Sequence, residues 1–121
     1  MRSMALSFIL SFVFIFSLHA QKIDVIIDSD TGNEVDDLYA LSSALIEPSW
    51  NILALNATHW QTSQWAEAET MENSHRLNQV LLGYLGKKVK TCRGGHARMY
   101  DWGDQARHSA AAYEIIKQAK A

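Results

Sequence analysis

The run Lys-Ile-Asp-Val-Ile-Ile-Asp at residues 22–28 constrains the fold of this chain more than any other feature. It is rich in β-branched side chains, and Val25, Ile26 and Ile27 are consecutive, so a strand built from them is apolar on both faces. A strand of this kind must be covered on both faces, which is typical of a parallel sheet. The run therefore predicts an α/β fold.

Strand-like and helical patterns alternate along the rest of the chain. They predict helices over 37–46, from 62 or 63 to 84 and over 109–121, and strands over 51–57 and 89–92. Asp36 is expected to cap the first helix, and Gly86 to end the second. Strands that alternate with helices favour parallel pairing. We therefore expect the N-terminal part of a Rossmann-like open parallel sheet with helices on both faces, incomplete because only three strands are predicted.

The first twenty residues have the pattern of a secretory signal peptide. Arg2 supplies a positive charge, residues 4–18 are almost entirely apolar, and Ala20 offers a small residue for cleavage. The apolar run is shorter than the ~20 residues that span a bilayer. We expect a secreted or periplasmic protein that leaves the membrane after cleavage at residue 20; an uncleaved N-terminal anchor is the alternative.

Composition excludes several classes of function. The 121 residues carry a formal charge of −2 and the pI is about 6.2, so no basic field attracts nucleic acid. The single cysteine, Cys92, excludes an intrachain disulfide framework and a multi-cysteine zinc site, and we expect it to be a small buried side chain. Nucleic acid is therefore not an expected partner.

Carboxylates crowd into the segment that follows the first predicted strand. The five are Asp28, Asp30, Glu34, Asp36 and Asp37. In open α/β sheets ligands bind at this carboxyl edge. Like charges at such density repel one another unless a cation lies among them, and a hard divalent cation with oxygen ligands is the simplest neutraliser. The alternative is that the last two carboxylates only stabilise the helix start and the others are surface turn residues.

This acidic segment resembles the N-terminal signature of the inosine/uridine-preferring nucleoside hydrolase family. The signature has a hydrophobic strand, Asp-x-Asp, a glycine-containing turn, Asp-Asp and x-x-Ala-Leu, and residues 26–41 read Ile-Ile-Asp-Ser-Asp-Thr-Gly-Asn-Glu-Val-Asp-Asp-Leu-Tyr-Ala-Leu. Residues 52–58, 68–73 and 89–94 resemble the strand, helix and glycine turn that follow. The turn over 31–35 is longer than the common form, so the chain resembles a divergent branch of the family.

The resemblance implies hydrolysis of the N-glycosidic bond of a ribonucleoside at a calcium site. On that resemblance Asp30 is a calcium ligand and also the general base that activates the attacking water. Asp37 is the second calcium ligand, Asp36 binds the ribose hydroxyls, and Asp28 lines the site. The implied cofactor is calcium and the implied partner is a small-molecule nucleoside; a homo-oligomer remains open for the full-length form.

The resemblance also places part of the site outside the sequence at hand. The family takes further calcium ligands from segments that would follow residue 121. We therefore interpret residues 21–121 as an N-terminal fragment of a nucleoside hydrolase-like domain, and we expect the isolated chain to be inactive. An exported calcium- or sugar-binding module without catalysis is the alternative, and a short stand-alone exported protein is the third interpretation.

Aromatic residues near the predicted sheet edge allow two interpretations. His59 and Trp60 follow the second strand, where they either contact a base or sugar or form a partly buried aromatic loop. His59 is thus a candidate substrate-binding residue. We interpret Trp65 and Tyr84 as core residues, and His75 as a surface or packing residue because it has no metal-ligand partner at helical spacing.

Overall fold

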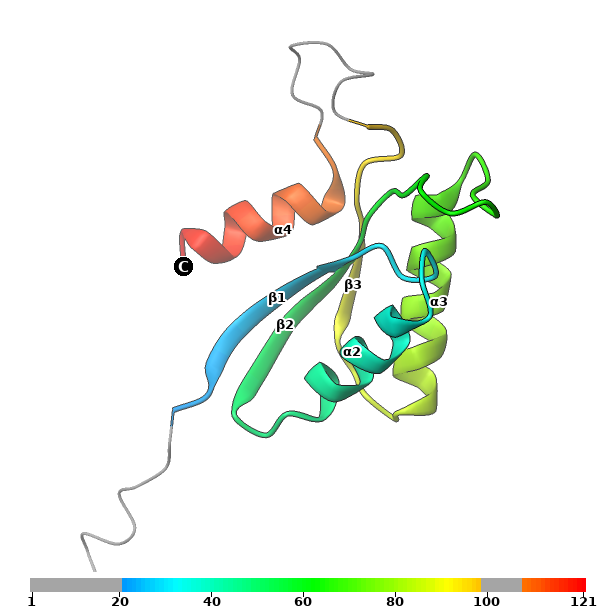
Figure 1. Cartoon of the computed structure of the whole chain (residues 1–121). Coiled ribbons are helices and arrows are strands. Elements are labelled where there is room, and N and C mark those ends of the chain that lie inside the picture. The colour runs from blue at the N-terminus through cyan, green and yellow to red at the C-terminus, as the bar shows by residue number, and fades with distance from the viewer. Residues whose placement is uncertain (1–20, 99–107) are drawn as a thin grey trace, which may run out of the picture.

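A computed structural model describes residues 21–98 and 108–121, so the predicted signal peptide lies outside the described residues. The elements follow the order β1 (Ile23–Ser29), α2 (Asp36–Ile46), β2 (Trp50–Ala57), α3 (Thr70–Tyr84), β3 (Lys90–Arg93) and α4 (Ala110–Ala119) (Figure 1). Within the described part of the chain, no helix combines the length and apolar character needed to cross a membrane.

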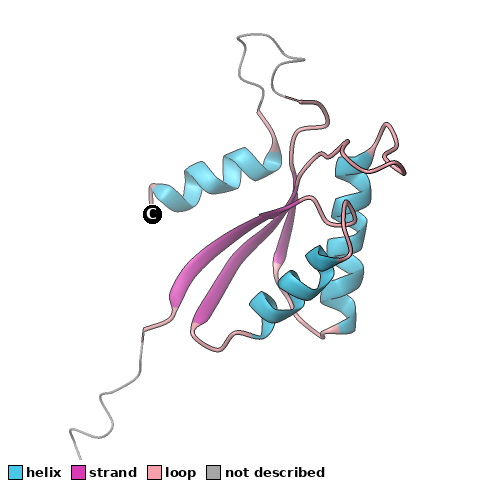
Figure 2. Cartoon of the chain, viewed as in Figure 1, coloured by secondary structure: helices cyan, strands magenta, loops and turns pink. Residues whose placement is uncertain are grey.

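The described strands form one open parallel sheet in the order β1-β2-β3. Ile23 lies opposite Trp50 at one end of the first pair, and Ala54 lies opposite Lys90 in the second. Helices α2 and α3 cover one face and α4 lies over the other (Figure 2). The α/β class and the incomplete Rossmann-like sheet predicted from the strand and helix patterns are confirmed.

The hydrophobic core lies between β2 and the two helices on the same face. Its buried side chains are Leu41 and Leu45 of α2, Leu55 of β2 and Leu82 of α3. Fully burying one leucine contributes roughly 1.5–3 kcal/mol, so this cluster is the main force that holds α2 and α3 on the sheet. Cys92 is also buried, as predicted, and its burial raises the pKa of the thiol.

Two helix starts differ from the sequence-based expectation. Asp36 does not cap α2 but is its first residue, and the cap position is Val35, which makes no side-chain cap bond. Helix α3 begins at Thr70 instead of residue 62 or 63. Residues 62–69 form a loop because their polar side chains bond to another segment of the chain, as described below.

The predicted helix ends are closer to the structure. Gly86 follows α3 with a φ of 61°, a conformation that glycine adopts readily. Tyr84 in the last turn is 87% exposed, so its interpretation as a core residue is wrong. The side chain of Ser109 accepts a hydrogen bond from the amide of Ala112 and caps α4.

Helix α4 is tied to the sheet by a charged pair. The carboxylate of Glu114 is buried and accepts a hydrogen bond from the ammonium of Lys90 on β3. The Nε2 group of Gln118 donates to the second carboxylate oxygen at 2.7 Å. The hydrogen bond from Lys90 lowers the pKa of Glu114, which keeps this buried group ionised.

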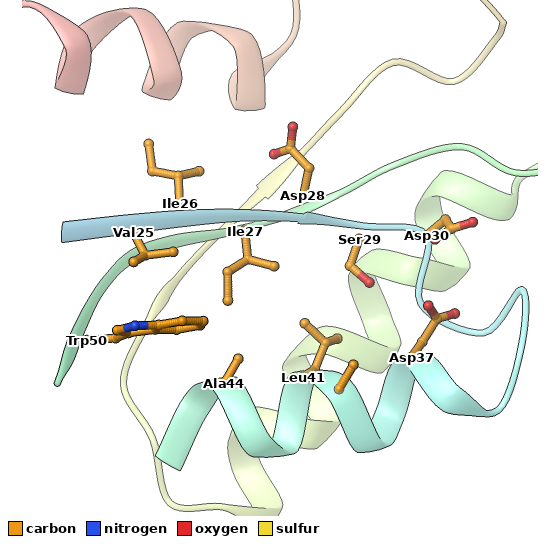
Figure 3. A pocket seen from close by; sticks show the side chains of 11 residues that line it. Val25, Ile26, Ile27, Asp28, Ser29, Asp30, Asp37, Leu41, Ala44 and Trp50 are labelled. Atoms are coloured by element: carbon orange, nitrogen blue, oxygen red, sulfur yellow. The ribbon is translucent and has the colours of Figure 1, made fainter. Parts of the chain in front are cut away.

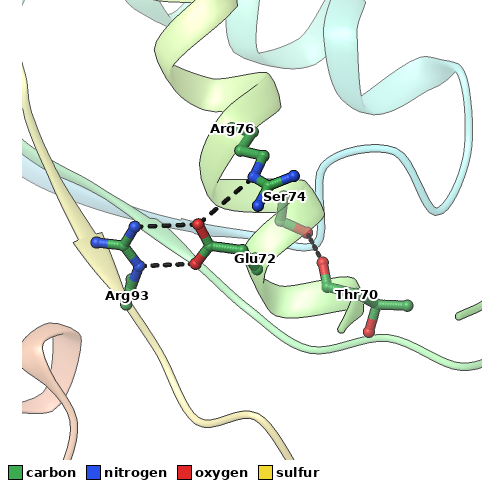
Figure 4. Close-up of polar contacts among 5 residues, drawn as sticks. All are labelled: Thr70, Glu72, Ser74, Arg76 and Arg93. Atoms are coloured by element: carbon green, nitrogen blue, oxygen red, sulfur yellow. Dashed lines mark hydrogen bonds and ion pairs between the residues drawn. The ribbon is translucent and has the colours of Figure 1, made fainter. Parts of the chain in front are cut away.

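Helix α3 is tied to the end of β3 by the carboxylate of Glu72 (Figure 4). Arg93 Nε lies 2.7 Å from Glu72 Oε2, and Arg93 Nη2 lies 3.0 Å from Oε1. Arg76 Nε is 3.6 Å from the same Oε1. The hydrogen bonds from Arg93 lower the pKa of Glu72 from 4.5 to about 2.

This lowered pKa predicts a loss of stability in acid. Because the pKa of Glu72 is lower in the folded state, the ion pair stabilises the fold above pH 4.5, and that contribution disappears as the pH falls towards 2. Thermal unfolding between pH 2 and 7 should therefore show a smaller acid-induced decrease of Tm for Glu72→Gln than for the unmodified chain. The control is Glu67→Gln, which changes an exposed carboxylate in the loop before α3. Parallel curves for the unmodified chain and Glu72→Gln would contradict the prediction.

Candidate functional site

The candidate site lies where β1 ends and α2 begins. We call residues 30–35 the acidic loop. Asp30 opens this loop and Asp37 lies in the first turn of α2, and both line a cavity of about 510 Å³ between strand and helix (Figure 3). The other walls are mainly apolar, with Ile27 and Leu41 among them. Asp30 and Asp37 are therefore charged groups at the end of the cavity where β1 ends, as the carboxyl edge of a parallel strand predicts, and Asp28 and Ser29 also border it.

Asp37 folds the acidic loop back onto the helix start. Its Oδ2 accepts hydrogen bonds from the backbone amides of Gly32 at 3.2 Å and Glu34 at 3.3 Å. These two hydrogen bonds hold the carboxylate of Asp37 against the backbone of the acidic loop. Its second oxygen makes no hydrogen bond to a described residue, which leaves it available to a ligand.

Asp30 is held by a neighbour within the loop. Its Oδ2 accepts a hydrogen bond from Asn33 Nδ2 at 3.0 Å, and its backbone carbonyl accepts one from the Asn33 amide at 3.0 Å. Both bonds belong to one tight turn, in which Gly32 has a φ of 100°. The turn fixes the orientation of the Asp30 carboxylate and leaves its Oδ1 without a described partner.

Asp28 points away from this pair. Figure 3 shows its side chain on the side of β1 that faces α4, whereas Asp37 approaches from α2. Asp28 Oδ1 accepts a hydrogen bond from Nδ2 of Asn56, its register partner on β2, at 2.8 Å. Asn56 is fully buried and was not a predicted site residue. Its position directly opposite Asp28 in a parallel register is the signal that could have identified it.

Two predicted site residues, Asp36 and His59, are not brought to the cavity. Asp36 is exposed in the first turn of α2 and does not line the cavity. His59 is half-buried in the loop after β2 and does not line it either. The geometry thus brings together Asp30 and Asp37, with Asp28 at the opposite face of the strand.

Three of the five carboxylates in the acidic segment accept hydrogen bonds. Over residues 21–98 and 108–121, no three His, Cys, Asp or Glu side chains lie close enough to hold a metal ion. Asn33, Asn56 and two backbone amides each donate to one of the aspartates instead. The two free oxygens of Asp30 and Asp37 suit a hard cation chemically, but calcium takes 6–8 oxygen ligands, so these residues supply only part of a calcium shell.

A buried polar contact anchors the acidic loop to α3. Thr31 is fully buried, and its Oγ1 donates to Asn78 Oδ1 at 2.6 Å and lies 2.9 Å from Ser29 Oγ. The apolar side chains of Leu77 and Val80 on α3 are 36% and 53% exposed. The helix instead buries a polar stripe at a spacing of four, formed by Thr70, Ser74 and Asn78. That spacing could have been read from the sequence.

The loop after β2 packs on the same polar stripe. Trp60 is buried, and its Nε1 donates to Ser74 Oγ at 3.0 Å. Its backbone amide and carbonyl both bond to Thr70 Oγ1, at 3.1 and 2.6 Å. For Trp60 the structure thus favours the partly buried aromatic loop over ligand stacking. His75 is buried, which lowers its pKa, so of the two roles predicted for it, surface or packing, the structure shows packing.

Residues 62–65 bind the acidic loop from outside. Asn33 Oδ1 accepts hydrogen bonds from Thr62 Oγ1 at 2.8 Å and Ser63 Oγ at 2.7 Å. Trp65 Nε1 donates to the carbonyl of Gly32 at 3.1 Å, while the residue is 57% exposed. The interpretation of Trp65 as a core residue is therefore wrong. These contacts also explain why a helix does not start at residue 62.

Comparison with known proteins found no match among protein-family models, curated proteins or solved structures. The function must therefore be argued from the residues of the site itself.

Proposed function

We propose that the acidic loop is part of a nucleoside hydrolase site, which cleaves the N-glycosidic bond of a ribonucleoside with Asp30 as the general base. The observation that supports this most is the placement of Asp30 and Asp37 in one cavity at the carboxyl end of β1. The proposal also draws on the resemblance of residues 26–41 to the family signature. The acidic turn is longer than in the common form of the signature, and Asn33 within it bonds to Asp30.

The residues of the loop have distinct parts in this chemistry. Asn33 holds one oxygen of Asp30, and the other oxygen, which has no partner among the described residues, would accept a proton from water. Negative charge at this end of the cavity stabilises an electron-poor anomeric carbon in the transition state. Bound calcium, held by Asp30 and Asp37, would acidify water and orient the sugar hydroxyls.

We expect calcium to bind weakly to this chain and to depend on Asp37. Replacement of one charged ligand should weaken binding about 10-fold or more, because Asp37→Asn removes a negative charge while its remaining carbonyl oxygen can still accept the loop amides. Calorimetric titration with calcium chloride measures the effect. Asp24→Asn is the matched control, since Asp24 lies at the other end of β1 and pairs with Asn51 at 2.6 Å.

Two results would contradict this prediction. Equal weakening by Asp24→Asn would mean that calcium responds only to net charge. Absence of any binding at millimolar calcium would remove the metal site from the proposal.

Hydrolysis separates the proposed enzyme from a non-catalytic binding module. The purified chain, incubated with inosine or uridine and calcium, should show negligible turnover because its described ligands do not complete a calcium shell. Substantial turnover would contradict that expectation. In any active longer form, Asp30→Asn should abolish hydrolysis and preserve the fold, whereas retained hydrolysis would rule out Asp30 as the general base.

A further inference from the structure

A second cavity of about 480 Å³ lies on the α3 side of the acidic loop. Gly32 of the loop forms one wall, and Trp65 and Leu77 form others. The loop packs closely here, since a Cβ on Gly32 would lie 2.6 Å from Leu77 Cδ1 and 3.9 Å from Trp60 Cζ2. Its size is within the range of ~300–1,000 Å³ that small-molecule sites occupy.

Trp65 gives this cavity a fixed aromatic surface. More than half of the residue is exposed, yet its indole N–H is bonded to the Gly32 carbonyl at 3.1 Å. An exposed indole whose polar group already has a partner offers its ring faces for stacking, and its fixed position lowers the entropy cost of binding. Leu77 and the buried Trp60 add apolar surface beside it.

The remaining side chains around the cavity are polar: one is negatively charged, one is neutral and one is positively charged. They are the carboxylate of Glu67, the amide of Asn73 and the guanidinium of Arg76. Arg76 contacts Glu72 through Nε at 3.6 Å and its side chain is 70% exposed, so it keeps N–H donors for a ligand. Donors and acceptors around an aromatic wall suit a flat ring that carries both kinds of group on its edge.

We propose that this second cavity binds a planar heteroaromatic ring of the nucleobase class, which stacks on Trp65. The assignment to a nucleobase rests on the proposed function. Gly32 lies two residues after Asp30, so a base in this cavity would be next to the loop that would act on its sugar. Base stacking on an aromatic side chain is also tolerant of base identity, which suits a site for more than one nucleoside.

Titration with hypoxanthine and with uracil tests the site. We expect a saturable shift of the Trp65 indole N–H signal in ¹H–¹⁵N spectra, and a dissociation constant that increases about 10-fold or more in Trp65→Ala. Trp65→Phe, which keeps an aromatic ring, should retain part of the affinity. Trp50→Ala is the matched control, because Trp50 is also partly exposed but lines the first cavity. The dispersion of the spectra shows that each variant is folded.

Several outcomes would overturn the inference. They are the absence of a shift at the solubility limit, an unchanged affinity in Trp65→Ala, and an equal loss in Trp50→Ala. Equal binding of indole, which lacks the polar ring edge, would also overturn it, since the polar side chains would then have no part. The proposed function fails independently, because calcium binding depends on Asp37 and base binding on Trp65.

Discussion

Gly94→Ala is expected to lower the free energy of unfolding by about 3 kcal/mol, the upper end of the cost of overpacking. A Cβ at this position would lie 2.3 Å from the carbonyl oxygen of Ala57 and 3.7 Å from the Cα of Thr58. Both neighbours are backbone at the end of β2, so neither can rotate away. The amide of Gly94 also donates to the Ala57 carbonyl at 2.9 Å. This hydrogen bond would be lost if the added methyl group pushed the two segments apart.

Gly83→Ala provides the matched control for Gly94→Ala. A Cβ on Gly83 meets nothing within 4 Å, and the residue lies inside α3. The same substitution should therefore stabilise the protein by about 0.5–1 kcal/mol, through the higher helix propensity of alanine. Thermal unfolding should show Tm shifts of opposite sign. A decrease of similar size in both variants would show that Gly94 has no special steric constraint.

Asn78→Ala is expected to destabilise the protein by about 2 kcal/mol. The substitution leaves a cavity at a fully buried position and removes the acceptor of the Thr31 hydroxyl. It also removes Asn78 Nδ2, a buried donor without a partner among the described residues, and this relief offsets part of the cost. The cavity and the lost acceptor outweigh it, because Thr31 retains only Ser29 as a partner.

The effect of Asn78→Ala should extend to the candidate site. Thr31 is adjacent to Asp30, so release of its hydroxyl should loosen the acidic loop and weaken calcium binding. Urea unfolding measures the stability and calorimetry measures the calcium affinity. Gln79→Ala, at the exposed neighbouring position, should change stability by no more than about 0.5 kcal/mol. If the two alanine variants behave alike, Thr31 and Asn78 do not anchor the loop.

These two predictions connect the fold to the site. Gly94 lets the loop after β3 pass close to the end of β2, and Asn78 holds the loop after β1. Both residues act at the carboxyl edge of the sheet, where the candidate site lies. Substitution at either position should therefore alter the site without touching a carboxylate.

The sequence was most informative where a local pattern was sufficient. The apolar run of β1 and the alternation of strands with helices predicted the parallel sheet, because burial on both faces requires apolar residues at successive positions. The same logic placed Asp30 and Asp37 at one edge, since a strand end and the following helix start are close in space in any βα unit.

The sequence was misleading where the decisive partner was distant in the chain. Trp65 has the composition of a core residue, but its indole bonds to Gly32 and leaves the ring exposed. Asp28 belongs to the acidic cluster in the sequence, but its carboxylate accepts a hydrogen bond from Asn56 on β2 and lies on the other face of β1. In both cases the sequence contains the residue but not the direction in which it points.

Local apolar periodicity thus determined the fold class, the order of the elements and the edge at which the carboxylates lie. Only the tertiary structure decided which carboxylates share a cavity and what holds them there. The physical reason is that a buried polar group must find a hydrogen-bond partner wherever the packed chain supplies one. For Thr31 that partner is Asn78, 47 residues away, and no local pattern records such a distance.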